Sequence, residues 1–299
     1  MAKLDDELDR KKSKARDSEY ISRSGSGREK NSFLENDWGS SGKPVQDAIH
    51  NANGYKQAIF SVTSFGKSRG QSSSFVDYMS QSESLDLLNE KGEIKKLNTA
   101  KKTIGKWIKS TKKRKGANRY TMHLMLSGDK ALDRKKMEKV TKDFIQKSFA
   151  GHEAIFAVHT DKDLIHSHVS IKMVGPDGKK IAANKSDLKK WRSEYAEVLR
   201  EHGIKASATS RVSRGLFGKS PPPGLKIVKE LYGQKLSDPY PRRYDKQQIK
   251  KWNDVYSKIG ENLINSANDN LIKQGKQILN FKARVSAKVM KHENEPTAN

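Results

Sequence analysis

Apolar and polar residues alternate with a period of two in the middle of the chain, as is typical of strands that bury one face. Four stretches show this alternation or are apolar runs of strand length: 57–63, 120–127, 154–158 and 165–173. Apolar residues also recur at helical spacing, most clearly in 133–147 and 187–202. Strands and helices that interleave in this way predict an α+β domain, with an antiparallel sheet and helices on one face of it.

Three of the eight histidines come together in this pattern. His166 and His168 lie on the polar side of the last predicted strand, and His159 follows the preceding strand, so a hairpin would bring all three together. Three neutral imidazoles on an open face are a typical divalent-metal site that leaves coordination positions for a substrate. Two alternatives stay open. One is a strand with incidental histidines; the other is a structural zinc site, which usually needs a fourth ligand such as the cysteine that this chain lacks.

The charge of the chain indicates a polyanionic partner, because 60 Lys and Arg against 35 Asp and Glu give a net charge of +25. Residues 1–50 contain ten residues of each sign, so the excess lies beyond them. Residues 91–119 carry twelve basic residues and a single acid, and Trp107 is expected to anchor them to the domain. We predict that this segment contacts phosphates, although a solvated face is the plainer alternative. Its densest basic run consists of Lys112, Lys113, Arg114 and Lys115.

Composition divides the chain into three predicted segments. Residues 1–50 are a flexible polar N-terminal segment, residues 51–215 form the folded domain, and residues 216–299 are a basic helical C-terminal region beyond a proline-rich break. The chain has no run of 18 apolar residues and begins without a signal peptide. We therefore expect a soluble, cytoplasmic protein without membrane insertion.

A basic domain with an open tri-histidine site suggests a metal ion that polarises a phosphodiester. Cleavage also needs a nucleophile, which would be water in a simple nuclease and tyrosine in a covalent strand transferase. Tyr78 is a candidate, since it lies in a predicted helix after the Gly-rich loop 66–70. Phe75 and Met79 share helical spacing with it, so a place in the core is the alternative for Tyr78. The Gly-Lys-Ser triplet in the loop lacks the first glycine of a P-loop.

The segment His159-x-Asp161-x-Asp163-x-x-His166-x-His168 resembles the third motif of conjugative relaxases in the HUH endonuclease superfamily. The likeness is greatest to the branch that contains VirD-type T-DNA border endonucleases and P-type mobilisation relaxases. Three further stretches resemble motifs of that branch in the same order: 59–79, 121–127 and 199–215. One departure is Ser167, which stands where the superfamily usually has an apolar residue. Because it points to the core side, we expect a local packing adjustment there.

The resemblance implies a five-stranded antiparallel sheet with an RRM/ferredoxin-like core, extended here by C-terminal helices. It implies that Tyr78 cuts one DNA strand and stays bound to the 5′ phosphate. The three histidines would hold one Mg²⁺ or Mn²⁺. Candidates for orienting a metal ligand are Asp161, Asp163 and His123, although the two aspartates could equally belong to a solvated turn and His123 could be an ordinary structural histidine. Two candidates for DNA contact outside the basic run are Arg211 and Arg214, which could also be merely a basic surface at the exit of a helix.

The resemblance also implies a biological setting, namely nicking at an origin of transfer that starts conjugative transfer or mobilisation of a plasmid or integrative element. The implied partners are single-stranded or supercoiled DNA at that origin, accessory origin-binding proteins and a type IV coupling protein, with possible export alongside the transferred strand. Two alternatives remain, a rolling-circle replication initiator and a non-catalytic basic DNA-binding protein.

Overall fold

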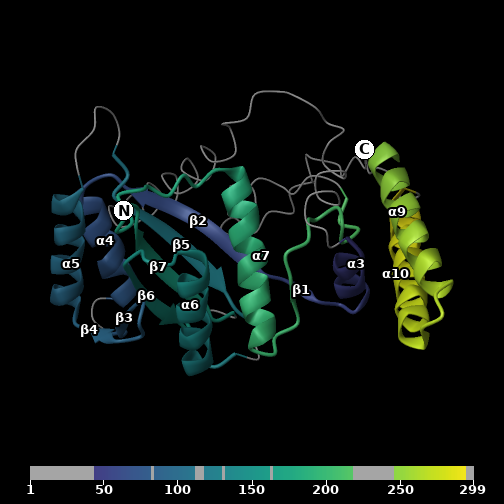
Figure 1. Ribbon diagram of the computed structural model, residues 1–299, viewed down its shortest axis with the longest axis horizontal. Coiled ribbons are helices and arrows are strands. Elements are labelled where there is room, and N and C mark those ends of the chain that lie inside the picture. Colours follow the sequence, from purple (N-terminus) through teal and green to yellow (C-terminus); the bar gives the residue numbers. More distant parts are fainter. Residues whose placement is uncertain are drawn as a thin grey trace, which may run out of the picture. The chain divides into compact units, whose positions relative to one another are not determined.

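The computed structural model describes six stretches of the chain: 44–81, 84–111, 118–129, 132–161, 164–217 and 246–293. They form two compact units (Figure 1), one with two hydrophobic cores and the other with a single one. The sheet unit consists of the described residues from Gln57 to Ala208, and the helical unit consists of those before and after it. None of the described helices is long and apolar enough to cross a membrane.

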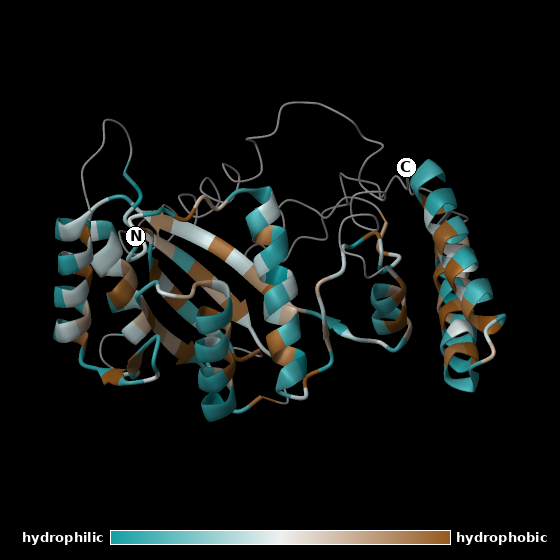
Figure 2. Cartoon of the chain, viewed as in Figure 1, coloured by the Kyte–Doolittle hydropathy of each residue, from teal (hydrophilic) through white to brown (hydrophobic). Residues whose placement is uncertain are grey.

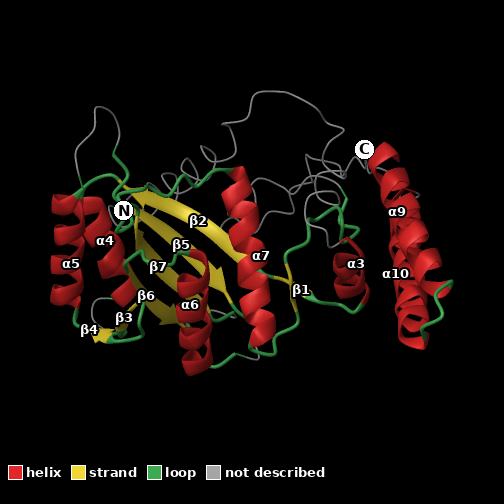
Figure 3. Cartoon of the chain, viewed as in Figure 1, coloured by secondary structure: helices red, strands yellow, loops and turns green. Residues whose placement is uncertain are grey.

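A six-stranded antiparallel sheet forms the centre of the sheet unit, in the order β2-β5-β7-β6-β3-β4 (Figure 3). Its strands are β2 (Ile59–Gly66), β3 (Leu87–Asn89), β4 (Ile94–Lys95), β5 (Thr121–Ser127), β6 (Ala154–His159) and β7 (His166–Lys172). A separate two-stranded sheet pairs β1 (Lys56–Gln57) with β8 (Ala206–Ser207). Strand β7, which carries two of the histidines, is therefore paired on both sides.

Helices cover both faces of the large sheet. On one face, α6 (Arg134–Ser148) and α7 (Lys185–Glu201) bury Phe144 and Tyr195 against apolar residues of the central strands. On the opposite face, α4 (Arg69–Ser80) and α5 (Leu97–Ser110) pack Met79 and Trp107 with Ile155 of β6. Figure 2 shows the apolar residues concentrated along the strands, where these two cores meet the sheet.

The α+β prediction with an antiparallel sheet is confirmed, and it differs from the structure in two details. The sheet has six strands and not five, because the β3–β4 hairpin consists of strands too short to show a period. The helices lie on both faces and not on one. The reason is the sequence of β6, in which Ile155 and Ala157 on one face are apolar like Phe156 and Val158 on the other. Both faces of this strand are therefore buried under helices.

The helical unit consists of α3 (Pro44–Ala52), α9 (Lys246–Ile264), α10 (Asp269–Glu293) and the segment from Thr209 to Phe217. Its core gathers residues from all of these parts: Ala48, Val212, Phe217, Trp252, Tyr256, Ile278 and Val289. Residues 44–50, which the sequence assigns to a flexible segment, thus belong to a helix that buries Ala48 completely. Likewise Val212, assigned to the main domain, is buried with the C-terminal helices.

Two glycines allow α9 and α10 to pack closely. A Cβ on Gly275 would lie 2.6 Å from the carbonyl oxygen of Gly260. We expect Gly275→Ala to destabilise the helical unit by about 1–3 kcal/mol, because the helices must move apart to relieve this overlap. The result would be diagnostic, since glycine to alanine inside a helix otherwise stabilises by about 1 kcal/mol. Urea unfolding followed by circular dichroism, with exposed Lys276→Ala as control, measures the effect; a more stable Gly275→Ala protein would contradict this packing.

Candidate metal and nucleophile site

Three imidazoles converge on the sheet face that α4 covers. The β6–β7 register places His159 directly opposite His166, and His168 lies two residues further along the same face. The ring centroids are 4.8 to 5.2 Å apart. One potential ligand atom from each ring lies within 4.8 Å of the other two, and all three side chains are buried. Within the described part of the chain, this is the one group of three or more His, Cys, Asp or Glu with such spacing.

Backbone carbonyls select the tautomer of two of these imidazoles. The His166 Nδ1 lies 3.2 Å from the Leu164 carbonyl oxygen, and His159 Nε2 lies 2.8 Å from that of Met79. Since a carbonyl only accepts hydrogen bonds, each of these nitrogens donates, and in the neutral form of the ring the other nitrogen carries a lone pair. For His166 that nitrogen, Nε2, is buried and has no hydrogen-bond partner among the described residues. Neutral imidazoles oriented in this way are suited to bind a divalent metal ion.

The last turn of α4 brings Tyr78 to this group. Its phenol oxygen is 3.4 Å from His168 Nε2, and the two ring centroids are 5.0 Å apart. The side chain is 44% exposed, whereas its helical neighbour Met79 is fully buried, so the helix places Met79 in the core and Tyr78 at the surface of the site. Partial burial raises the pKa of Tyr78 above its usual value of 10, and the negative charge of Asp161 raises it further by a smaller amount.

The other candidates for orienting a ligand are placed differently. Asp161 Oδ1 lies 4.0 Å from His159 Nδ1, which is an ion-pair distance and too long for a hydrogen bond. Asp163 lies outside the described residues. His123 is buried beside the triad, but its ring nitrogens pair with Ser64 and Thr121, each at 2.9 Å, and not with any of the three histidines.

Two features of the site have no signature in the sequence. The first is the Met79 carbonyl described above, because any residue could supply it. The second is Gln81, which ends α4 in the left-handed region with φ 45° and ψ 50° and places its amide Nε2 3.3 Å from His159 Nδ1. On the opposite face, Ser167 points into the core as expected, where its hydroxyl meets that of Thr141 from α6 at 2.6 Å. This hydrogen bond satisfies a polar group in an apolar setting.

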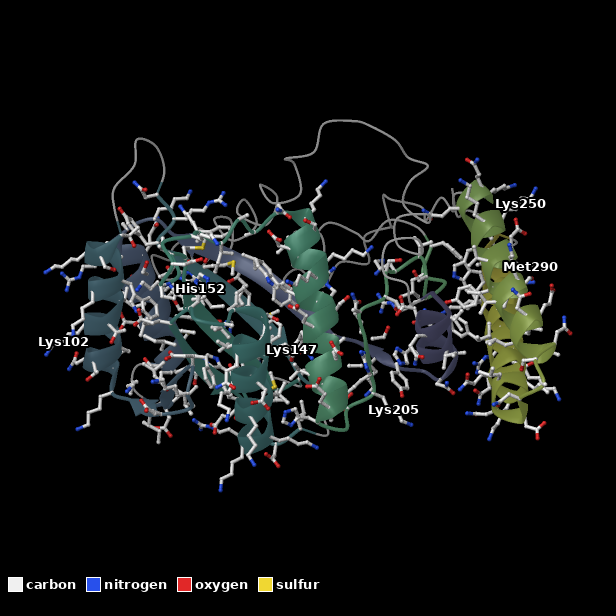
Figure 4. The ribbon with its side chains drawn as sticks, viewed as in Figure 1. Lys102, Lys147, His152, Lys205, Lys250 and Met290 are labelled. Carbon is white, nitrogen blue, oxygen red and sulfur yellow. The ribbon has the colours of Figure 1, made fainter. Side chains whose placement is uncertain are left out.

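The predicted DNA contacts are only partly described. Lys112, Lys113, Arg114 and Lys115 all lie outside the described residues. Arg211 and Arg214 belong to the helical unit and not to the unit that carries the triad. Four described basic residues of the region 91–119 lie on α5, where Lys102 points outward (Figure 4) and Lys106 and Lys109 are exposed. Trp107 anchors this helix as expected: it is buried, and its indole N–H donates to Glu153 Oε2 at 2.8 Å.

Burial of His123 has a consequence for stability, because it lowers the pKa of this residue to about 3. The folded protein keeps His123 neutral, whereas the unfolded chain takes up a proton below a pH of about 6.5. The stability contributed by the neutral ring is therefore complete above pH 6.5 and decreases as the pH falls toward 3. Between pH 6.5 and 4.5 we expect a loss of about 2 kcal/mol that is absent in His123→Gln. Urea unfolding at both pH values measures it; equal losses in the two proteins would contradict the prediction.

Comparison with known proteins adds an independent observation. Residues 78–204 match the family model for a relaxase, the MobA/VirD2-like nuclease domain. The matched range begins at Tyr78 and includes all three histidines. Among solved structures, one described as "Molecular Basis of Vancomycin Resistance Transfer in Staphylococcus aureus" is similar over 52% of this chain and 99% of that chain, with 14% identity and a TM-score of 0.38. No curated protein matches the chain.

Proposed function

We propose that this protein, whose residues 78–204 match the model of the MobA/VirD2-like relaxase nuclease domain, nicks one strand of DNA at an origin of transfer through a covalent tyrosyl intermediate. The observation that carries the proposal is the contact between Tyr78 and the histidine triad, at 3.4 Å from His168. A half-exposed phenol beside three buried imidazoles joins a nucleophile to a potential metal site. A simple nuclease, in which water is the nucleophile, would not need a tyrosine beside the triad.

In the proposed reaction, the Tyr78 phenol oxygen attacks the phosphorus of the scissile phosphodiester. The bond from the tyrosine oxygen to phosphorus forms while the bond from phosphorus to the 3′ oxygen of the preceding nucleotide breaks. The phenol gives up its proton, and the leaving oxygen takes up a proton as a free 3′ hydroxyl. The product is a 5′-phosphotyrosyl bond, which keeps the energy of the diester, so the same site can rejoin the strand by the reverse steps.

The triad fits a divalent ion, because the buried His166 Nε2 and His159 Nδ1 are held as lone-pair donors. His159, His166 and His168 would hold one Mg²⁺ or Mn²⁺. Such an ion would stabilise the charge that develops on the phosphate and favour the phenolate form of the tyrosine. The second effect matters here, because burial and Asp161 raise the pKa of Tyr78 and so oppose its ionisation.

The proposed substrate is single-stranded or supercoiled DNA at the transfer origin of a plasmid or integrative element. Exposed Lys102, Lys106 and Lys109 on α5 offer positive charge in the same unit as the triad, which supports a phosphate-contacting surface. The proposed partners are accessory origin-binding proteins and a type IV coupling protein, in keeping with conjugative transfer from the cytoplasm.

The test is to incubate the purified protein with single-stranded oligonucleotides that span the transfer origin of its host element. With Mg²⁺ or Mn²⁺, we expect part of the protein to shift on a denaturing gel by the mass of the 3′ fragment of the oligonucleotide. EDTA should abolish the shift. Tight binding without any adduct would overturn the proposal in favour of a non-catalytic DNA-binding protein.

A further inference from the structure

We propose that His123 is a positioning residue that holds helix α4, and with it Tyr78, in place against the sheet. The inference rests on the proposed function of Tyr78 as nucleophile. His123 contacts neither Tyr78 nor the triad through a hydrogen bond, and it lies on β5, beside the histidine strand β7. Its effect on the reaction would pass entirely through the position of the helix.

A directional chain of hydrogen bonds ties His123 to the first turn of α4. The Ser72 hydroxyl donates to the Ser68 carbonyl at 3.0 Å, and it therefore accepts from the Thr121 hydroxyl, also at 3.0 Å. The Thr121 oxygen then accepts from His123 Nε2 at 2.9 Å, and Ser64 donates to Nδ1 at 2.9 Å. The backbone carbonyl of Ser68, at the N-cap of α4, thus fixes the direction of every hydrogen bond in this series. Through the series, the imidazole links α4, β5 and β2.

A ring stack ties His123 to the middle of the same helix. The imidazole lies parallel to the Phe75 ring, with an interplanar angle of 1° and a centroid separation of 3.8 Å. Phe75 in turn lies 6.1 Å from Tyr78 and 6.1 Å, edge-on, from His168. The stack with His123 therefore fixes the position of the Phe75 ring, and this ring contacts both Tyr78 and His168.

The contacts follow one face of α4 from its start to the nucleophile. Ser72, Phe75 and Tyr78 are spaced by three residues, so they lie along the same side of the helix. The close approach of this face depends on Gly66 at the end of β2, where a Cβ would lie 2.1 Å from the Ser72 oxygen and 2.2 Å from that of Thr121. Because the helix cannot approach differently without breaking these contacts, the position of Tyr78 depends on His123.

Histidine is suited to this role because one flat side chain must do two things at once. Its nitrogens make hydrogen bonds in the plane of the ring to two hydroxyls, while its face stacks on an aromatic ring. Glutamine can reproduce in-plane hydrogen bonds but not the stack, and phenylalanine can reproduce the ring but neither hydrogen bond. The two substitutions therefore separate the contributions.

The experiment compares His123→Gln and Phe75→Leu with the wild-type protein and with His152→Gln. The control histidine, labelled in Figure 4, is partly buried in the same unit, and its Nδ1 lies 2.8 Å from the Lys172 carbonyl oxygen. We expect both test variants to slow adduct formation under single-turnover conditions by about 10- to 100-fold, because small displacements of reacting groups cost that much. Dissociation constants for the oligonucleotide and for Mn²⁺ should stay within about threefold of wild type, since His123 makes no hydrogen bond to a triad histidine and the Phe75 side chain has no hydrogen-bonding group.

Phe75→Tyr keeps the stacking ring and should restore the rate, whereas the double variant His123→Gln/Phe75→Leu should lose little more than either single variant, because both remove the same stack. Should His123→Gln fail to fold, Phe75→Leu still tests the stack without disturbing the buried hydrogen bonds. A wild-type rate in a folded His123→Gln protein, or an equal loss in His152→Gln, would overturn the inference.

A second readout separates this inference from the proposed function. The ring signals of ¹³C-labelled Tyr78, assigned by Tyr78→Phe, and their nuclear Overhauser effects to His168 report the position of the nucleophile without any DNA. We expect these effects to weaken in His123→Gln and to persist in His152→Gln. If the wild-type protein forms no adduct, the proposed function fails. The Tyr78 signals then test the positioning role by themselves, and unchanged signals in His123→Gln would overturn it.

Discussion

Replacement of Tyr78 by phenylalanine is expected to reduce formation of the covalent DNA adduct by at least about 10³-fold while DNA binding is retained. Phenylalanine keeps the ring that packs against Phe75 and His168, and it removes only the oxygen that lies 3.4 Å from His168 Nε2. The helix should therefore remain in place. Adduct formation on a denaturing gel and fluorescence anisotropy with the same oligonucleotide measure the two properties separately.

The matched control for this variant is Tyr55→Phe, which removes the hydroxyl of a partly exposed tyrosine in the helical unit. It should form the adduct at the wild-type rate. An adduct that persists undiminished in Tyr78→Phe would assign the nucleophile to another residue. A nick that persists without any adduct would instead indicate hydrolysis by water.

Removal of one triad histidine is expected to weaken Mn²⁺ binding by at least about 100-fold in His166→Ala, because loss of a group that merely orients a ligand already costs 10- to 100-fold. The variant removes the buried Nε2 that has no hydrogen-bond partner among the described residues. Isothermal titration calorimetry measures the affinity without any DNA.

The same prediction has a second consequence for stability. At a metal concentration about 100 times the dissociation constant, Mn²⁺ should stabilise the wild-type protein by about 2.7 kcal/mol and leave His166→Ala nearly unchanged. His202→Ala serves as control, since this histidine pairs with Asp143 at 2.8 Å on α6 and is not part of the triad. Equal metal stabilisation of wild type and His166→Ala would exclude the triad as the binding site.

The metal-site candidate follows almost entirely from local sequence. A period of two puts His166 and His168 on one face of a strand whatever the rest of the fold does, and the adjacent apolar run makes a hairpin that brings His159 to them. The same period assigns Ser167 to the core face. The relaxase resemblance, confirmed by the family match over residues 78–204, adds the order of the motifs along the chain.

The sequence could not predict how α4 lies on the histidine face. Its helical spacing leaves Phe75, Tyr78 and Met79 equally able to enter a core. Only the packing of Met79 with Ile155 from β6 decides that Met79 is buried and that Tyr78 reaches His168. Long-range burial also decides that α3 joins α9 and α10, since nothing near Ala48 in the chain indicates partners some 200 residues away.

The sequence by itself determined strands β2, β5, β6 and β7, the face on which the histidines lie and the class of fold, because these depend on the spacing of neighbouring residues along a regular backbone. The tertiary structure decided what covers that face: it placed the tyrosine beside the triad, gave His159 the Met79 carbonyl and gave His123 the Phe75 ring. Those contacts join segments far apart in the chain, and they form only when the cores on the two sides of the sheet are packed together.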